Sequence, residues 1–337
     1  RPAKHGGCRA PLAGEQIMKR SVNSADTMVS LAQAYLAERR CLGFDLKISG
    51  HVLMNFARFA DALGHRGPIT EDLTLTWAHS TPSERAITWA RRIEVIRPFA
   101  KYLKQFDPDT VVPRRDLCGR AHRRLAPHIY TEQELGELLT ASVAMLPVGS
   151  IRPLTYEALF GLIAATGLRI SEAINLSRDD VNLAEGTLTV RETKFHKSRV
   201  IPMHPTVTLA MKRYATRRAL VVAAEPCVSF FVNLDGRKLQ ARTVHWVFGR
   251  LREQLGWTSR GDHALPRIHD LRHTFVCRCI LKWYRDGVNV DNRMIALSTY
   301  LGHVKPSDTY WYLTAVPDLM EIVSQKFACF TEGVRHD

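Results

Sequence analysis

Long apolar runs are missing from this sequence of 337 residues. No stretch reaches the roughly 18 to 20 consecutive apolar residues that a membrane-spanning helix needs. The start of the chain, residues 1–7, lacks the apolar segment of a signal peptide. We therefore expect an intracellular, cytoplasmic protein.

Patterns that bind metal ions are also missing. The seven cysteines are odd in number and scattered, and only Cys277 and Cys279 lie close together. One intervening residue is too few for a zinc-binding CxxC pair, so we interpret both as reduced, buried thiols of a helix. The fourteen histidines include no HExxH motif. We expect no metal and no other cofactor.

Negative charge is in short supply. Asp and Glu number 33 against 47 Lys and Arg, which gives a formal net charge of +14 and a pI near 9.7. Such an excess predicts attraction to polyanions, and nucleic acid is the first candidate partner. A merely basic soluble protein is the alternative.

Periodicity and composition divide the chain into segments. A hydrophobic content of 45% is enough for two domains, each with its own core. We expect a disordered extension at 1–23, a helical domain at 24–107, a basic linker with prolines at 108–128, a second domain at 129–316, and a C-terminal helix and tail at 317–337.

Apolar residues recur at helical spacing throughout 24–107. The pattern predicts helices from an N-cap at Asp26 to Gly43, over 52–64, after Thr70, and over 83–103 with a kink at Pro98. Basic side chains near the helix ends, on the polar faces and in the linker could contact phosphates, and a solvated basic surface is the alternative. The candidates are Arg39, Arg40, Lys47, Arg91, Arg92, Lys101, Arg114 and Arg115.

The second domain is predicted to be mostly helical with a small sheet. Strands are expected at 181–190 and 199–202, joined across a basic hairpin tip, with a short strand at 228–232. Helices are expected after a capping pattern at 130–135 and at 156–165, 206–222, 242–255, 269–285, 291–300, 307–313 and 317–329. The fold class is therefore mainly α with a small antiparallel β-sheet.

Separated motifs of this domain carry side chains suited to phosphate chemistry. Two guanidiniums, an ammonium, two imidazoles and a phenol match a phosphodiester in charge and shape. Tyr312 lies nine residues after His303, and a helical step of about 200° between Tyr310 and Tyr312 means that both cannot face one phosphate. The set is Arg169, Lys194, His269, Arg272, His303 and Tyr312.

Each member of this set has a candidate role in breaking a phosphodiester. Arg169 and Arg272 can fork onto the non-bridging oxygens, and His303 can donate a further hydrogen bond. A tyrosine needs a base or a cationic field, and His269 is placed to act as that base. Lys194 would protonate the leaving oxygen, with Lys197 as the alternative lysine on the same hairpin. His273 is expected on another helix face, and we expect it to serve in core packing or a backbone hydrogen bond rather than in catalysis.

The motifs together resemble the tyrosine recombinases, the phage integrase family. They are Thr-Gly-Leu-Arg-Ile-Ser-Glu, the hairpin Lys-Phe-His-Lys-Ser-Arg-Val-Ile-Pro, His-Asp-Leu-Arg-His-Thr-Phe, and Leu-Gly-His with the later tyrosine. The resemblance implies the catalytic set above, with Glu172 supporting it. It implies strand cleavage through a 3′-phosphotyrosyl bond and rejoining without metal or ATP.

The resemblance also implies partners. It makes 24–107 a core-binding domain and 129–316 the catalytic domain of a DNA clamp. Expected partners are double-stranded DNA with inverted repeats, a homotetramer on two duplexes in which the C-terminal helix docks in trans, and accessory proteins. The place of action would be the bacterial nucleoid. Lys197, Lys238, Arg242 and Thr243 are further candidate DNA contacts.

Two other functions stay open on the residues alone. One is a type IB topoisomerase, which uses a similar site to relax supercoils, and the other is a DNA-binding protein that has lost catalysis. Leu-Gly-His and the helical first domain argue against the topoisomerase, and the completeness of the set argues against lost catalysis. The sequence around the aromatic run Tyr310-Trp311-Tyr312 is similar to that of recombinases carried by transposable elements.

Overall fold

The chain divides into two compact units, Arg1–Arg124 and Leu125–Asp337, which we describe separately. The computed structural model describes residues 26–119, 121, 125–191, 198–221, 227–303, 305–314 and 324. The expected disordered extension at 1–23, the hairpin lysines Lys194 and Lys197, and all of the C-terminal helix at 317–329 except Ser324 lie outside these residues.

The first unit is a helical bundle around one apolar core. Leu53, Phe56, Trp77, Ile96 and Phe99 are at most 2% exposed and form its centre. The described secondary structure of this unit is therefore helical. Its helices are α1 (Met28–Cys41), α2 (Lys47–Ala62), α3 (Glu71–His79) and α4 (Ala86–Leu103).

The helix starts of this unit differ in detail from the sequence pattern. Thr27, rather than Asp26, caps α1, because its Oγ1 accepts from the backbone N–H of Ser30 at 3.1 Å. The carboxylate of Asp61 on α2 accepts from the first two backbone amides of α1, those of Met28 and Val29, which have no partner within the helix. Helix α4 begins at Ala86 rather than Ser83 and continues past Pro98.

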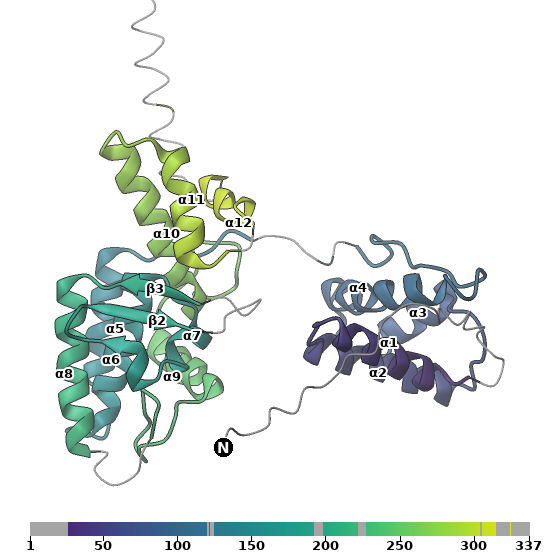
Figure 1. Cartoon of the computed structure of the whole chain (residues 1–337), viewed down its shortest axis with the longest axis horizontal. Coiled ribbons are helices and arrows are strands. Elements are labelled where there is room, and N and C mark those ends of the chain that lie inside the picture. Colours follow the sequence, from purple (N-terminus) through teal and green to yellow (C-terminus); the bar gives the residue numbers. More distant parts are fainter. Residues whose placement is uncertain are drawn as a thin grey trace, which may run out of the picture. The chain divides into compact units, whose positions relative to one another are not determined.

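The second unit combines helices with a small antiparallel sheet (Figure 1). Strands β1 (Val181–Asn182), β2 (Thr187–Val190) and β3 (Arg199–Pro202) pair in the order β1-β2-β3. The fold class predicted from the sequence is thereby confirmed. The helices are α5 (Glu132–Val143), α6 (Ile151–Thr166), α7 (Ile170–Ile174), α8 (Pro205–Val221), α9 (Ala241–Gln254), α10 (Ile268–Arg285), α11 (Val290–Leu301) and α12 (Ser307–Tyr310), with 3-10 turns η1 (Arg178–Asp180) and η2 (Trp311–Thr314).

The prediction of one strand at 181–190 was wrong. The segment folds into β1 and β2 around a turn in which Asn182 Oδ1 accepts from the amides of Ala184 and Glu185. Gly186 closes the turn with a φ of +66°, which glycine adopts without steric cost.

Two further element limits were also wrong. Residues 228–232 form only isolated bridges, Ser177 with Ser229 and Val232 with Lys238. Helix α6 begins at Ile151, five residues earlier than expected, because Ser150 caps it and Pro153 is tolerated in the first turn.

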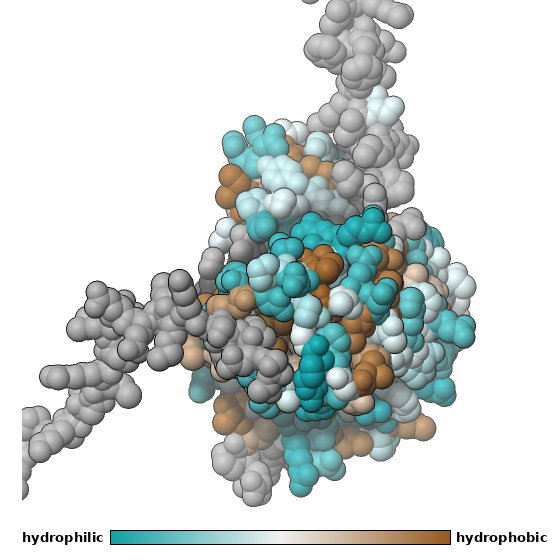
Figure 2. All heavy atoms as spheres, turned by 90° about the vertical axis from the view of Figure 1, so that its right-hand side faces the viewer, coloured by the Kyte–Doolittle hydropathy of each residue, from teal (hydrophilic) through white to brown (hydrophobic). Residues whose placement is uncertain are grey.

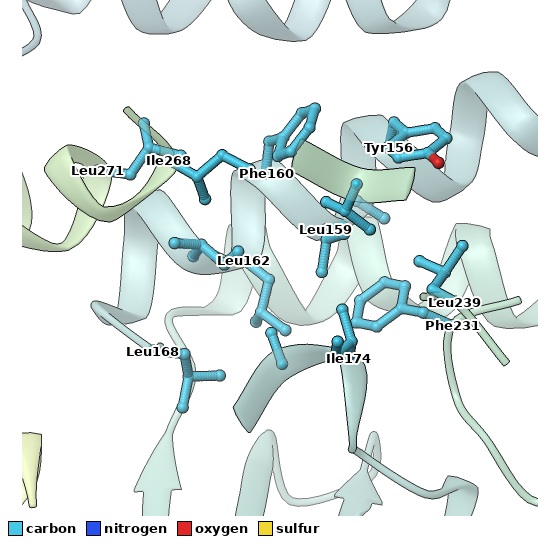
Figure 3. Packing of buried hydrophobic residues seen from close by; sticks show 14 of the residues in the cluster. Tyr156, Leu159, Phe160, Leu162, Leu168, Ile174, Phe231, Leu239, Ile268 and Leu271 are labelled. Carbon is cyan, nitrogen blue, oxygen red and sulfur yellow. The ribbon is translucent and has the colours of Figure 1, made fainter. Parts of the chain in front are cut away.

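Helix α6 runs through the centre of the second unit's core (Figure 3). Leu159, Phe160 and Leu162 of this helix are fully buried. The same cluster contains Leu168 and Leu271, which directly precede Arg169 and Arg272 in sequence. Burial of these leucines at 1% and 0% exposure fixes the backbone from which both arginines project.

The surface carries apolar residues among polar ones. On the face drawn in Figure 2, hydrophobic residues form patches surrounded by hydrophilic ones. Exposed apolar side chains of the first unit include Leu42, Ile48 and Leu63. Among the helices described, none is long and apolar enough to cross a membrane.

Candidate active site

Arg272 lies at the centre of the site, where α10 passes the ends of α6 and α11. Its side chain is 1% exposed, Nη1 donates to Gly167 O at 2.6 Å, and Nη2 donates to Leu301 O at 2.8 Å. Burial, and then the positive charge of Arg169, lower the pKa of Arg272 to about 10. The guanidinium therefore stays charged at neutral pH.

Glu172 joins two further arginines beside Arg272. Its carboxylate accepts from the backbone N–H of Arg169 at 2.9 Å and from Arg169 Nη1 at 2.8 Å. It also accepts from Arg199 Nη1 at 3.2 Å and Nη2 at 2.9 Å. Burial alone would raise the pKa of Glu172, but the bonds from Arg199 and Arg169 outweigh it and keep the pKa below its usual value. Glu172 is therefore an anion that positions both guanidiniums.

Arg199 is a residue that sequence reasoning missed. It lies on β3, its side chain is 12% exposed, and its Nε donates to Tyr300 O at 2.7 Å. It also passes under Gly302, where an added Cβ would lie 2.9 Å from Nη1. The signal available in the sequence is its place in the motif Lys-Phe-His-Lys-Ser-Arg-Val-Ile-Pro.

His303 is held between Arg272 and Thr309. Its Nε2 lies 3.1 Å from Arg272 Nη2, and its Nδ1 lies 2.7 Å from Thr309 Oγ1. Burial, followed by the charges of Arg272 and Arg169, lowers the pKa of His303 to about 4. The ring is therefore neutral at pH 7 in the DNA-free protein.

Tyr312 is buried beside these groups at 3% exposure. Its ring lies nearly parallel to that of His303, with an interplanar angle of 7° and centroids 6.5 Å apart. Burial raises the pKa of Tyr312 to about 12, although the charge of Arg272 acts in the opposite direction. The phenol is therefore protonated at neutral pH.

The phenol forms a hydrogen bond with His273, at 3.0 Å from Nδ1 to Tyr312 Oη. The expectation that His273 serves in core packing or in a backbone hydrogen bond was therefore wrong. His269 and His273 are four residues apart and share one helix face, with ring centroids 4.7 Å apart. This face is turned to η2, and that proximity could not be read from the sequence of α10 alone.

His269, the expected base, is exposed and contacts His273. The neighbouring residues partly exclude water from the His269 ring, and this desolvation, followed by the charges of Arg272 and Arg267, lowers the pKa of His269 to about 4. Between His269 and His273, the imidazole that forms a hydrogen bond with the phenol is thus His273.

The backbone after His303 departs from the expected helix at 307–313. Only Ser307–Tyr310 is α-helical, and Trp311–Thr314 forms a 3-10 turn. Tyr312 is buried in the site, whereas Tyr310 is only half-buried. The tighter turn of about 120° per residue still separates the two side chains.

The candidate DNA contacts differ in how free they are. Arg39 stacks over Phe44 at 4.3 Å, and Arg92 stacks over Trp77 at 3.9 Å and donates to Ser80 Oγ. The exposed members are Arg40, Lys47, Arg91, Lys101, Arg114, Arg115, Lys238, Arg242 and Thr243. In the part of the chain that the structure covers, no cluster of three His, Cys, Asp or Glu side chains could hold a metal ion.

Residues 129–317 match the model of the phage integrase family. The chain belongs to this family of tyrosine recombinases. It is 36% identical over 299 residues to the y4rB protein of Sinorhizobium fredii, whose name assigns it to the integrases or recombinases, with 88% of this chain and 95% of the relative covered. It is 30% identical over 283 residues to the tyrosine recombinase XerC of Bacillus licheniformis, covering 79% and 84% of the two chains.

Solved structures share the fold. The Tn1549 transposon integrase in complex with transposon right end DNA is 19% identical, with a TM-score of 0.63 over 90% of this chain and all of that chain. The recombinase XerH, bound to its palindromic difH substrate, is 18% identical, with a TM-score of 0.61 over 90% and 86% of the two chains.

Proposed function

We propose that this recombinase cleaves one DNA strand by attack of Tyr312 on a phosphodiester. The product is a 3′-phosphotyrosyl bond and a free 5′-hydroxyl, and a 5′-hydroxyl of a partner duplex then reverses the reaction. The observation that carries the proposal is the convergence, within one chain, of the Tyr312 phenol, Arg272 and His303. Relatives that are named as recombinases, and neighbours solved with DNA, support DNA as the substrate.

The charges of the site suit the transition state of this reaction. Arg169 and Arg272 would bind the non-bridging oxygens, with Glu172 holding Arg169 in place. A phenol with a raised pKa does not ionise spontaneously at neutral pH, so its proton must pass to an acceptor during attack. His273 lies at hydrogen-bond distance from it. Lys194, which lies between β2 and β3 in the sequence, would protonate the leaving oxygen, and the reaction would need neither metal nor ATP.

A nicked suicide duplex tests the proposal. The duplex carries inverted repeats taken from the DNA that flanks the gene, and the nick traps the covalent adduct. We expect wild-type protein and the Tyr310→Phe variant to form the adduct and Tyr312→Phe to form none. Loss of the adduct in Tyr310→Phe but not in Tyr312→Phe would show that the wrong phenol has been chosen.

The same assay separates the two other functions. Binding of the duplex without any adduct would favour a DNA-binding protein that has lost catalysis. Rapid relaxation of supercoiled plasmids that lack the repeats would favour a type IB topoisomerase.

We further propose that exchange takes place in a homotetramer on two duplexes, with the segment after Pro317 docked on a neighbouring copy. The segment carries Leu319, Met320, Ile322, Val323, Phe327 and Phe330 at helical spacing. A hollow of about 560 Å³ between α5, α6 and α8, lined by Leu135, Leu139 and Val207, has matching apolar character. Analytical centrifugation on DNA should show loss of the tetramer for a chain that ends at Val316 and for Leu139→Glu. Unchanged assembly of the shortened chain would contradict docking of this segment on a neighbouring copy.

A further inference from the structure

Thr309 contacts the imidazole of His303 on the side away from Arg272. Thr309 lies on α12 and is fully buried, and its Oγ1 is 2.7 Å from His303 Nδ1. On the other side of the ring, His303 Nε2 is 3.1 Å from Arg272 Nη2. Both ring nitrogens of His303 therefore have a defined partner.

The identity of these partners determines the tautomer of His303. A guanidinium has only donors, so Nε2 must be the acceptor of the Arg272 hydrogen bond and carries no hydrogen. The ring hydrogen is therefore on Nδ1, which donates to the hydroxyl of Thr309. In the DNA-free protein, the nitrogen that faces Arg272 thus accepts a hydrogen bond.

A bound phosphodiester would require the opposite polarity at this nitrogen. A phosphate oxygen only accepts, so Nε2 can contact it only after gaining a hydrogen. The charged groups around the ring are Arg272 on α10, Arg169 before α7, Arg199 on β3 and Asp308 on α12, and the phenol of Tyr312 lies over it. The three arginines oppose protonation, whereas Asp308 and an added phosphate anion favour it.

We propose that Thr309 is a positioning residue that holds His303 while its Nε2 changes from hydrogen-bond acceptor to donor. On phosphate binding, Arg272 turns its N–H to the phosphate and Nε2 takes up one proton from solvent. Nδ1 keeps its own proton and its bond to Thr309 Oγ1, so the ring becomes an imidazolium with both N–H groups paired. This inference rests on the proposed function, because it assigns a phosphodiester to the site.

Two substitutions distinguish the effect of the Thr309 hydroxyl from the effect of its packing. Thr309→Val keeps the volume and removes the acceptor, so that a buried N–H of the imidazolium would be unpaired. Thr309→Ser keeps the acceptor and removes only a methyl group. We expect single-turnover adduct formation to fall roughly tenfold to a hundredfold in Thr309→Val and less than about threefold in Thr309→Ser.

The pH profile supplies a readout that a purely structural role would not move. Without its acceptor the imidazolium is less stable, so the profile of Thr309→Val should be displaced to lower pH while that of Thr309→Ser matches wild type. Thermal melting checks that each variant folds. A Thr309→Val protein with wild-type rate and profile would overturn the proposal, as would a serine variant that is as impaired as the valine variant.

A measurement without DNA separates this inference from the proposed function. Long-range 1H–15N spectra of the full chain, with the His303 signals assigned from His303→Gln, should show the hydrogen on Nδ1 in wild type and Thr309→Ser. Thr309→Val should lose that single state. If wild type carries its hydrogen on Nε2, the inference fails even where the adduct forms. A hydrogen on Nδ1 in a protein that forms no adduct would support the tautomer but contradict the proposed cleavage of a phosphodiester.

Discussion

Two sets of positive charges, one in each unit, are held in opposite ways. In the second unit, Arg272 and Arg199 are 1% and 12% exposed and are fixed by carbonyl oxygens and by Glu172. In the first unit, Lys47 is 81% exposed although it pairs with Asp45 at 3.2 Å, and Arg40 is also exposed.

This difference separates two tasks of a protein that acts on DNA. Fixed guanidiniums can place a phosphate to within a fraction of an ångström, which chemistry requires. Exposed cations move and are screened, and they contribute affinity that depends on salt rather than on geometry. Substitutions of fixed and exposed cations should therefore affect different measurements.

Replacing the most deeply fixed cation should have the largest effect. Arg272→Lys keeps a positive charge but removes the fork, so we expect adduct formation to slow by about 10²- to 10³-fold. Single-turnover kinetics on the suicide duplex measure this. Arg40→Lys is the matched control and should stay within about twofold of wild type. A similar loss in both variants would remove the distinction between fixed and exposed cations.

Removing the anion that fixes the arginines should destabilise the second unit. Glu172→Gln leaves Arg169 and Arg199 without their counter-charge, and the loss of a partner in a buried pair costs about 3 kcal/mol or more. We expect the melting temperature to fall by roughly 6 to 12 °C. Glu185→Gln, at an exposed turn, is the control and should melt within about 1 °C of wild type.

The phenol contact should matter less than the arginines. Neither an asparagine nor a glutamine side chain can take up the phenol proton, so His273→Asn and His273→Gln should both slow adduct formation by about tenfold or more. Wild-type rates in both variants would mean that His273 does not accept the proton of Tyr312.

Exposed cations should change affinity and its salt dependence only. Replacing both Arg40 and Lys47 by Ala should reduce the slope of log K against log salt by about 2. The adduct rate at saturating DNA should remain within about twofold of wild type. Fluorescence anisotropy at several salt concentrations measures the slope, and an unchanged slope would exclude both residues from the interface.

The smallest expected effect is the response of the DNA-free protein to mild acid. The pKa of His303 and of His273 is lowered, to about 4 and about 2 respectively, so the unfolded chain binds more protons than the folded chain below pH 6.5. The contribution of these two histidines to the free energy of unfolding is therefore fully present above about pH 7 and is lost as the pH falls toward 4. Melting temperatures at pH 7 and pH 5 should differ by several degrees, and His303→Gln should reduce that difference.

Local patterns predicted most of the elements, because capping residues and helical periodicity are properties of short segments. The capping box of Thr131 and Glu134 starts α5 as expected. The turn at Asn182 and the early start of α6 at Ser150 were missed, because a single side chain bonding to the backbone overrode an otherwise continuous pattern.

The contacts of the site were less accessible to sequence reasoning. Arg169, Arg272, His303 and Tyr312 were selected as residue types in motifs, and the structure brings them together. The roles of Arg199 and His273 depend on where β3 and η2 pack against other elements. Contacts between residues 27 and 39 positions apart cannot be derived from one segment at a time.

The two carbonyl groups that hold Arg272 have a further consequence. Gly167 follows the last residue of α6 and Leu301 ends α11, so the guanidinium lies at the negative ends of two helix dipoles. Its charge is compensated by helix ends rather than by water before any DNA arrives. The cost of removing water from this cation therefore falls within the folding reaction, and DNA binding does not have to repeat it. The guanidinium that we expect to bind the phosphate is thus already free of water in the folded protein.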